Sequence, residues 1–457
     1  MDQTSTAPSP GGALVPERRH RDRRQRRPPV LALALALAVV AVVAGVAIGR
    51  FLTYQQPAAR VPPPSVQGQA DSIATLEQRV AANPDDAAGW RSLGVAYVRR
   101  SAEVGDPAFY RLAGQALDRA ATLAPDDPLT LLAQGALAMS LHQFPQALEL
   151  GTRATEDLPS SADALGVRVD AQVELGRYDD AVISLQRMLD LRPGLPALAR
   201  ASYLRELHGD VAGAVEAMTR AQAAGASPFD VATVSALLGA LQFQQGDLAG
   251  AGSTFDRALQ ASPGLVLAEV GRAKVLAAGG EVPEAIDVLK DVVERFPAPQ
   301  AVILLGDLQK RSGQDAEATE TYALVRAIAA LQQSAGQVVD LEMAIFEADQ
   351  AEDLPRAVEL ARRAYEVRPA NVYVNDALGW ALLRSGDAAG AVAPMEQALR
   401  LGTADPLVRY HAAEVFSALG DTDRARVELR QALAGTPWFS FRHHDRVMEL
   451  AVALGVG

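Results

Sequence analysis

The chain of 457 residues contains no cysteine. This absence excludes disulfide bonds, thiolate nucleophiles and cysteine-ligated zinc sites. Lysine is nearly absent too, because Lys274, Lys290 and Lys310 are the only three and arginine supplies the remaining positive charge. Aromatic residues make up 5% of the chain, against 49% for all hydrophobic residues. Small aliphatic side chains must therefore form most of the core.

Positive charge is scarce outside the N-terminal region. The formal net charge of the chain is −12. Residues 1–60 hold nine arginines against Asp2, Glu17 and Asp22, so the remaining residues carry a net charge of −18. Binding to phosphate backbones requires a basic surface. We therefore expect no nucleic-acid partner.

One long segment lacks charge altogether: VLALALALAVVAVVAGVAIG, residues 30–49. A helix of about 20 residues spans the roughly 30 Å hydrocarbon core of a bilayer. Seven arginines precede this segment within residues 17–29. The excess of positive charge on that side predicts a cytoplasmic N-terminus. We predict a transmembrane signal-anchor helix at residues 30–52 of the cytoplasmic membrane, with the rest of the chain on the extracytoplasmic side.

The segments that flank this helix have a different composition. Residues 1–29 are rich in proline and arginine and are predicted to form a disordered cytoplasmic tail. Residues 53–67 are predicted to form an extended, proline-rich linker. The alternative to a retained anchor is a secretory signal cleaved near Gly45-Val46-Ala47. Both interpretations place the large C-terminal domain outside the cytoplasm.

After residue 83 the sequence becomes periodic. The gaps from Pro125 to Pro159, from Pro159 to Pro193 and from Pro263 to Pro297 are each 34 residues. Small residues recur between the prolines, and a glycine marks the middle of most units. This pattern predicts antiparallel helix pairs, neither helix of which can bury its apolar stripe alone. Stacked pairs would bury it in a continuous core, with contacts between neighbouring pairs and none over long range.

The stretch GWRSLGVAYVRR, residues 89–100, carries the most specific motif. Its Trp90, Leu93, Gly94 and Tyr97, followed by the small residues and proline of the same unit, resemble the tetratricopeptide repeat (TPR) signature. The resemblance implies an all-α, right-handed solenoid of about ten helix-turn-helix repeats over residues 68–437. A capping helix is predicted at residues 438–457.

Four glycines occupy one slot of this repeat. Glycine inside a helix costs roughly 1 kcal/mol relative to alanine, so close packing of another helix must offset this cost. We predict that such a helix lies against each of these glycines, which are Gly94, Gly239, Gly306 and Gly379.

The sequence contains no recognisable catalytic motif. H-E-x-x-H, G-x-S-x-G and the P-loop are all missing, so we predict a protein that is not an enzyme, with no cofactor and no small-molecule substrate. The stretch His443-His444-Asp445 suggests a metal, but adjacent helix residues face different directions. We therefore predict no metal site and interpret the stretch as the polar face of the capping helix.

The resemblance also implies a binding surface. Ligands of TPR domains usually lie against the concave face formed by the first helix of each repeat. The residues that this implies for a partner-binding groove are Phe346, Tyr373, Asp376, Trp380, Tyr410 and Glu414. Aromatic side chains among carboxylates suit an apolar or basic peptide. The alternative is that several of these side chains only pack between neighbouring repeats.

These observations predict a membrane-anchored scaffold that binds a protein or peptide partner on the extracytoplasmic side. The stretch LEQRVAANPDDAAGWRSLGVAY, residues 76–97, also resembles the start of the repeat domain in membrane-anchored cytochrome c maturation factors. An accessory factor of cytochrome c maturation or of envelope assembly is therefore the alternative function.

Overall fold

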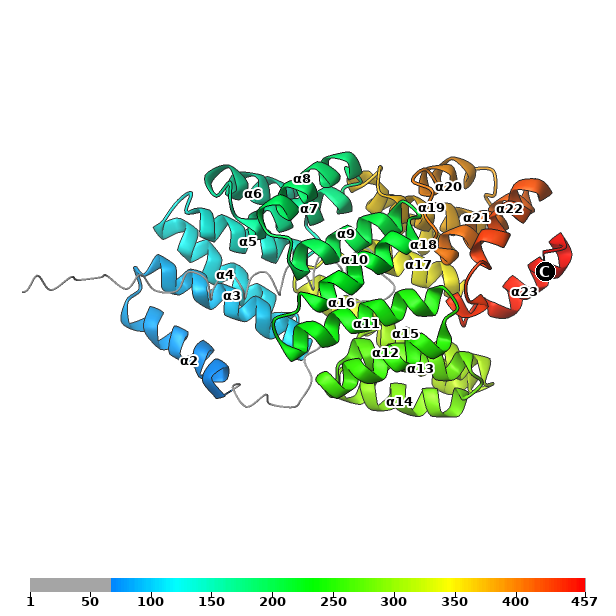
Figure 1. Cartoon of the computed structure of the whole chain (residues 1–457), viewed down its shortest axis with the longest axis horizontal. Helices are drawn as coiled ribbons and strands as arrows, with labels where there is room; N and C mark the ends of the chain where they lie inside the picture. Colours follow the sequence, from blue (N-terminus) through cyan, green and yellow to red (C-terminus); the bar gives the residue numbers. More distant parts are fainter. Residues whose placement is uncertain (1–66, 457) are drawn as a thin grey trace, which may run out of the picture.

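A computed structural model describes residues 67–456, which form α-helices, one 3-10 helix and no β-strand (Figure 1). The prediction of an all-α fold is confirmed for this part of the chain. The predicted tail at 1–29, the transmembrane helix at 30–52 and nearly all of the linker lie outside it. None of the helices within residues 67–456 is long and apolar enough to cross a membrane.

Ten antiparallel helix pairs follow the single helix α2 (Gln67–Ala82) within the described residues. The first helices of the pairs are α3 (Ala87–Val104), α5 (Pro128–Ser140), α7 (Ala162–Glu174), α9 (Leu195–Leu207), α11 (Pro228–Gln244), α13 (Val266–Ala278), α15 (Pro299–Arg311), α17 (Asp340–Gln350), α19 (Val372–Arg384) and α21 (Pro406–Ala418).

The second helices of the pairs are α4 (Ala108–Leu123), α6 (Phe144–Asp157), α8 (Tyr178–Leu191), α10 (Val211–Ala223), α12 (Leu248–Ala261), α14 (Val282–Arg295), α16 (Asp315–Ser334), α18 (Leu354–Val367), α20 (Val392–Ala398) and α22 (Thr422–Ala432). The 3-10 helix η1 (Pro437–Phe439) and helix α23 (His444–Leu454) end the chain. Figure 1 shows α2 and α23 at opposite ends of the molecule.

Short polar side chains begin many of these helices. The side chain of Ser227 accepts a hydrogen bond from the backbone N–H of Asp230, and the Asp230 carboxylate accepts one from the N–H of Ser227. This reciprocal pair satisfies two donors that a helix start leaves free. At other helix starts an aspartate side chain accepts a hydrogen bond from one backbone N–H, as at Asp86, Asp127, Asp210, Asp247 and Asp421.

The two helices of a pair differ in how much of their surface is buried. Second helices bury one stripe, as α14 does with Ala285, Ile286, Leu289 and Val292. First helices are buried on nearly every side, so that α9 buries Arg200 and Glu206 as well as its apolar residues. The first helices therefore form the inner layer of the molecule and the second helices the outer layer.

The prediction for the four glycines is confirmed. A β-carbon at Gly94 would lie 2.6 Å from Leu117 Cγ, and one at Gly239 would lie 2.9 Å from Phe255 Cε1. Gly306 meets Tyr322 and Gly379 meets Met395 in the same manner. Each glycine therefore lets the second helix of its own pair approach the first.

The prediction that pairs contact only their neighbours is wrong. The N–H of Val338 donates to Leu141 O (3.0 Å), and the N–H of Thr436 donates to Gln244 O (3.2 Å). These contacts, together with Glu174–Arg368 and Gly209–Gly402, join segments nearly 200 residues apart. We call these four contacts the inter-turn seam. They form because the stack of helix pairs coils. The turn that joins the two helices of an early pair, such as Leu141 after α5, then meets the loop that connects two later pairs, such as Val338 between α16 and α17.

The two sides of the seam also approach closely around Glu174. Arg368 donates to the Glu174 carboxylate (2.9 Å) and Asn371 donates to the Glu174 carbonyl (2.9 Å). A β-carbon at Gly176, where φ is +73°, would lie 2.3 Å from the carbonyl carbon of Ala370. Glycine is needed here both for its backbone conformation and for the closeness of the two segments.

Coiling encloses polar side chains of the first helices. Asp170 of α7 and Arg200 of α9 are 4% and 3% exposed and form two hydrogen bonds of 2.6 and 2.7 Å. Burial raises the pKa of Asp170, and the charge of Arg200 opposes this shift. Burial also raises the pKa of Glu174 to about 7, although Arg368 works against it. The inner face is therefore a packed, charge-paired interior over this part of the stack.

Candidate functional site

A cavity of about 710 Å³ lies at the C-terminal end of the stack. Four first helices line it, namely α15, α17, α19 and α21, and the segment from Phe441 to Arg446 closes one side. The lining residues are Asp307, Lys310, Arg311, Asp349, Trp380, Leu383, Arg384, Tyr410, Glu414, Ala418, Phe441, Arg442, His443, Asp445 and Arg446. We call this cavity the C-terminal pocket.

Three residues of the predicted groove, Trp380, Tyr410 and Glu414, line the C-terminal pocket. They are 2%, 1% and 9% exposed, respectively. The expectation that they project from an open concave face is therefore wrong. The chain's own C-terminal segment lies against that face and covers them: Arg446 binds both carboxylate oxygens of Glu414 (2.8 and 3.0 Å).

The other three predicted groove residues lie outside the pocket lining. Phe346 is 2% exposed and packs edge-on against Tyr322, with ring centroids 5.9 Å apart. Asp376 is 2% exposed and pairs with His411. Tyr373 is half-buried among apolar residues of neighbouring pairs. For Phe346 and Asp376 the alternative interpretation, packing between repeats, is the one that the structure supports.

Trp380 forms the floor of the pocket within a stack of rings and charges. The His411 ring lies parallel to it with centroids 4.1 Å apart, and the Arg384 guanidinium lies 5.1 Å from its centroid. Its indole N–H donates to the carboxylate of Asp349 (2.8 Å). The ring and the polar atom of Trp380 are thus engaged within the protein, so it positions other groups and presents little surface to a ligand.

The rim of the pocket is mostly basic. Lys310, Arg311, Arg384, Arg442 and Arg446 face four carboxylates there. Three of these carboxylates, on Glu414, Asp445 and Asp307, are paired with rim arginines. Burial raises the pKa of the third, Asp307, to about 7, with the charge of Arg442 opposing the shift. The lining therefore carries one more basic side chain than it has carboxylates, on a strongly acidic domain.

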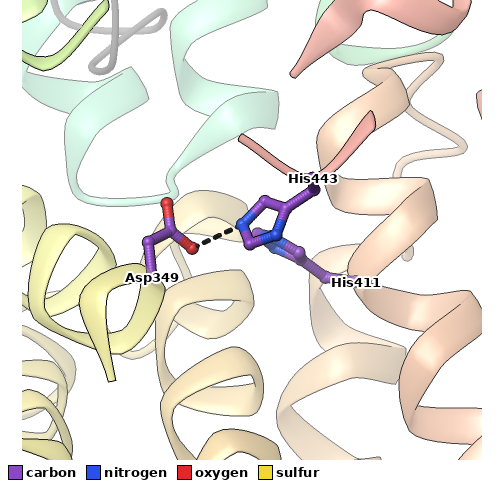
Figure 2. Close-up of side chains that lie close together, drawn as sticks. All are labelled: Asp349, His411 and His443. Carbon is purple, nitrogen blue, oxygen red and sulfur yellow. Dashed lines mark hydrogen bonds and ion pairs between the residues drawn. The ribbon is translucent and has the colours of Figure 1, made fainter. Parts of the chain in front are cut away.

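Three titratable side chains meet beside the floor of the pocket (Figure 2). Asp349 lies in the last turn of α17, His411 lies in α21, and His443 precedes α23. One ligand atom from each lies within 4.8 Å of the other two. His443 Nε2 is 2.9 Å from Asp349 Oδ1, as the dashed line in Figure 2 marks. Two imidazoles and a carboxylate are a donor set that could hold a divalent metal ion.

Electrostatics within this cluster favour an ionised Asp349. Burial raises the pKa of its carboxyl, but the neighbouring His443 and His411 outweigh burial and lower the pKa to about 2. Burial disfavours protonation of His411, and the carboxylates of Asp376 and Asp349 outweigh it and raise the pKa of His411.

The prediction that His443, His444 and Asp445 form the polar face of the capping helix is wrong for His443, which is 7% exposed and bonded to Asp349. The prediction that the neighbouring histidines face different directions is confirmed, because His444 stacks on Trp438 with centroids 3.6 Å apart. No local pattern links Asp349, His411 and His443, and only the folding of three pairs and the C-terminal segment brings them together.

Comparisons with known proteins agree with the geometry of the repeats. One tetratricopeptide repeat model matches residues 132–196, 198–266 and 347–406, and a second matches residues 242–301. A comparison with curated proteins gives no match.

Several solved structures match this chain, each with a TM-score below 0.5. Yeast Tom70 is 14% identical, with 81% of this chain and 96% of that chain covered and a TM-score of 0.35. The Cut9–Hcn1 hetero-tetramer of APC/C is 14% identical, with 91% of this chain and 98% of that chain covered and a TM-score of 0.35. A tetratricopeptide repeat protein from Parabacteroides merdae is 18% identical, with 56% of this chain and 98% of that chain covered and a TM-score of 0.34.

The helix pairs, the glycines that let them approach and the turns between them recur through the described residues. The two repeat models together match half of the chain. The chain therefore belongs to the tetratricopeptide repeat family.

Proposed function

We propose that the protein is a membrane-anchored interaction scaffold and that its C-terminal pocket binds a short acidic segment of a partner protein. Tetratricopeptide repeats are typical of protein-interaction scaffolds, and they bind partners through stacked first helices. Four of these first helices line the pocket, and its volume is large enough to hold a few side chains of a partner. No chemical step is required of the residues that line it.

The charge of the rim carries this proposal. Five basic side chains and four carboxylates line the pocket, a small excess of positive charge in a domain whose residues 61–457 have a net charge of −18. Asp376 and Glu414, on which a basic peptide was expected to dock, are already neutralised by His411 and Arg446. Arg384 has no carboxylate partner among the described residues and holds its guanidinium over Trp380. An acidic segment that enters along Arg384 and Leu383 fits this arrangement better than a basic one.

Photo-crosslinking tests the location and the charge of the bound segment. A photoreactive residue at Leu383 of the full-length chain should capture a partner in cells, whereas one at Ile183, on the outer surface of α8, should not. We expect Arg384→Glu to lower the yield at Leu383 by more than about tenfold, since like charges at an interface cost several kcal/mol. Arg356→Glu, on the outer surface of α18, is the matched control and should leave the yield unchanged.

The captured segment is then identified by mass spectrometry of the crosslinked peptide. Equal yields at Leu383 and Ile183, or a captured segment with a net positive charge, would contradict the proposal.

The anchor and its direction form the second part of the proposal. The arginines before the uncharged run at residues 30–49 support a helix with a cytoplasmic N-terminus. Protease added to intact bacterial cells stripped of their wall should digest the repeat domain and spare the N-terminal tail, as detected by antibodies to each end. Both parts should become accessible once the membrane is permeabilised. A repeat domain that stays protected in intact cells would refute this topology.

A further inference from the structure

We propose that Asp349, His411 and His443 bind one zinc-class divalent metal ion at the floor of the C-terminal pocket. The cluster is half-buried to fully buried, and its three ligand atoms lie within 4.8 Å of one another. In a tetrahedral site with bonds of about 2.0–2.1 Å, ligand atoms are separated by about 3.3 Å. The His443–Asp349 separation of 2.9 Å is already close to this value, and the widest separation must close by about 1.5 Å at most.

The hydrogen bonds of His411 are the observation that points to a ligand. Its ring is fully buried, and its Nδ1 is 2.9 Å from Asp376 Oδ1. Its Nε2 is buried without a hydrogen-bond partner in the structure. A buried polar atom left unpaired costs about 1–3 kcal/mol. A carboxylate on one ring nitrogen and a free second nitrogen are what a metal-binding histidine presents, because the carboxylate orients the ring and raises its basicity.

The donor set indicates the class of metal. Imidazole nitrogens suit zinc, copper, iron and nickel, whereas magnesium and calcium prefer sites made of oxygen ligands alone. Zinc binds sets of two histidines and one carboxylate with a fourth position open. Asp349 and His443 line the C-terminal pocket, so the open position would face its interior. The indole N–H of Trp380, which already donates to Asp349, would hold the carboxylate in place.

The ion would also fasten the C-terminal segment to the stack. His443 belongs to that segment, whereas His411 and Asp349 belong to α21 and α17. One ion would therefore tie together three parts of the chain. Because a ligand that binds only the folded state stabilises it, zinc should slow hydrogen exchange in α23. This consequence does not depend on any partner protein.

The test is zinc binding to the full-length chain, purified in detergent without a histidine tag and stripped with a chelator. Calorimetric titration and elemental analysis should give one zinc ion per chain, and cobalt should give the visible absorption of a tetrahedral site. We expect His443→Gln and Asp349→Asn each to weaken zinc binding by more than about 100-fold. Asp376→Asn, which removes the orienting carboxylate, should weaken it by about 10–100-fold.

His444→Gln is the matched control because His444 is adjacent to His443 and stacks on Trp438; it should leave the affinity unchanged. Circular dichroism checks that each variant folds. Three variants test the metal site separately, so if one misfolds the other two still test the proposal. Absence of stoichiometric zinc in the wild-type chain would overturn the proposal. So would an equal loss in His443→Gln and His444→Gln, or zinc binding that survives both His443→Gln and Asp349→Asn.

Discussion

Replacing Arg368 with alanine should lower the free energy of unfolding by about 3–5 kcal/mol at pH 8. Arg368 and Glu174 are both buried and form the charged contact of the inter-turn seam. The substitution leaves the Glu174 carboxylate buried without its counter-charge. Denaturant unfolding of the full-length chain, followed by circular dichroism, measures the loss. Hydrogen exchange should rise on both sides of the seam, in α7–α8 and in α18–α19.

The loss should be larger at pH 8 than at pH 5. The pKa of Glu174 is about 7 in the folded protein, above its ordinary value of 4.5. A carboxyl whose pKa is raised by folding binds more protons in the folded state, so stability falls as pH rises from about 4.5 through the folded pKa. Without Arg368 the folded pKa of Glu174 rises further, and the fall extends to higher pH. At pH 5 the carboxyl is protonated in the folded variant, and most of the deficit disappears.

Arg272→Ala is the matched control. The side chains of Arg272 and Asp256 are 51% and 56% exposed and pair at 3.5 Å between neighbouring helix pairs, away from the seam. Surface ion pairs contribute about 0–1 kcal/mol. Replacing both Arg368 and Glu174 by apolar residues of similar volume should restore much of the stability, because a buried ion pair often contributes little net free energy. A loss below about 1 kcal/mol for Arg368→Ala at pH 8 would show that the Arg368–Glu174 contact does not stabilise the seam.

Replacing Phe255 with alanine should lower the free energy of unfolding by about 3–5 kcal/mol, the range for large core aromatics. Phe255 is 1% exposed and fills the space left by two glycines, Gly239 of α11 and Gly271 of α13. The two glycines have no side chains to fill that space, so we expect the truncation to leave a cavity.

The measurement is the urea midpoint together with the slope of the transition. Tyr365→Ala, at an aromatic position 38% exposed on α18, is the control and should change stability by less than about 0.5 kcal/mol. If Phe255→Ala and Tyr365→Ala lose the same stability, the close approach at Gly239 and Gly271 does not depend on the phenylalanine ring.

The sequence by itself determined the class of fold and the repeat. The 34-residue spacing of prolines and the glycine slot depend on local rules, namely helix periodicity and close packing within one pair. These rules act over one repeat length, so the residue pattern is sufficient to predict that Gly94 and Gly239 pack closely against another helix. The uncharged run at residues 30–49 predicts an anchor on equally local grounds and lies outside the described residues.

Only the tertiary structure decided which inner residues are free to bind. The pitch of the coil brings Glu174 to Arg368 and turns an open concave face into a closed interior. The C-terminal segment then covers Tyr410 and Glu414 and brings His443 to Asp349, 94 positions away in the chain. Contacts of this kind depend on small rotations between repeats that add up over the stack. Such rotations leave no periodic signal in the sequence, and for this reason residue patterns do not show which of the predicted groove residues are buried and miss the cluster of Asp349, His411 and His443.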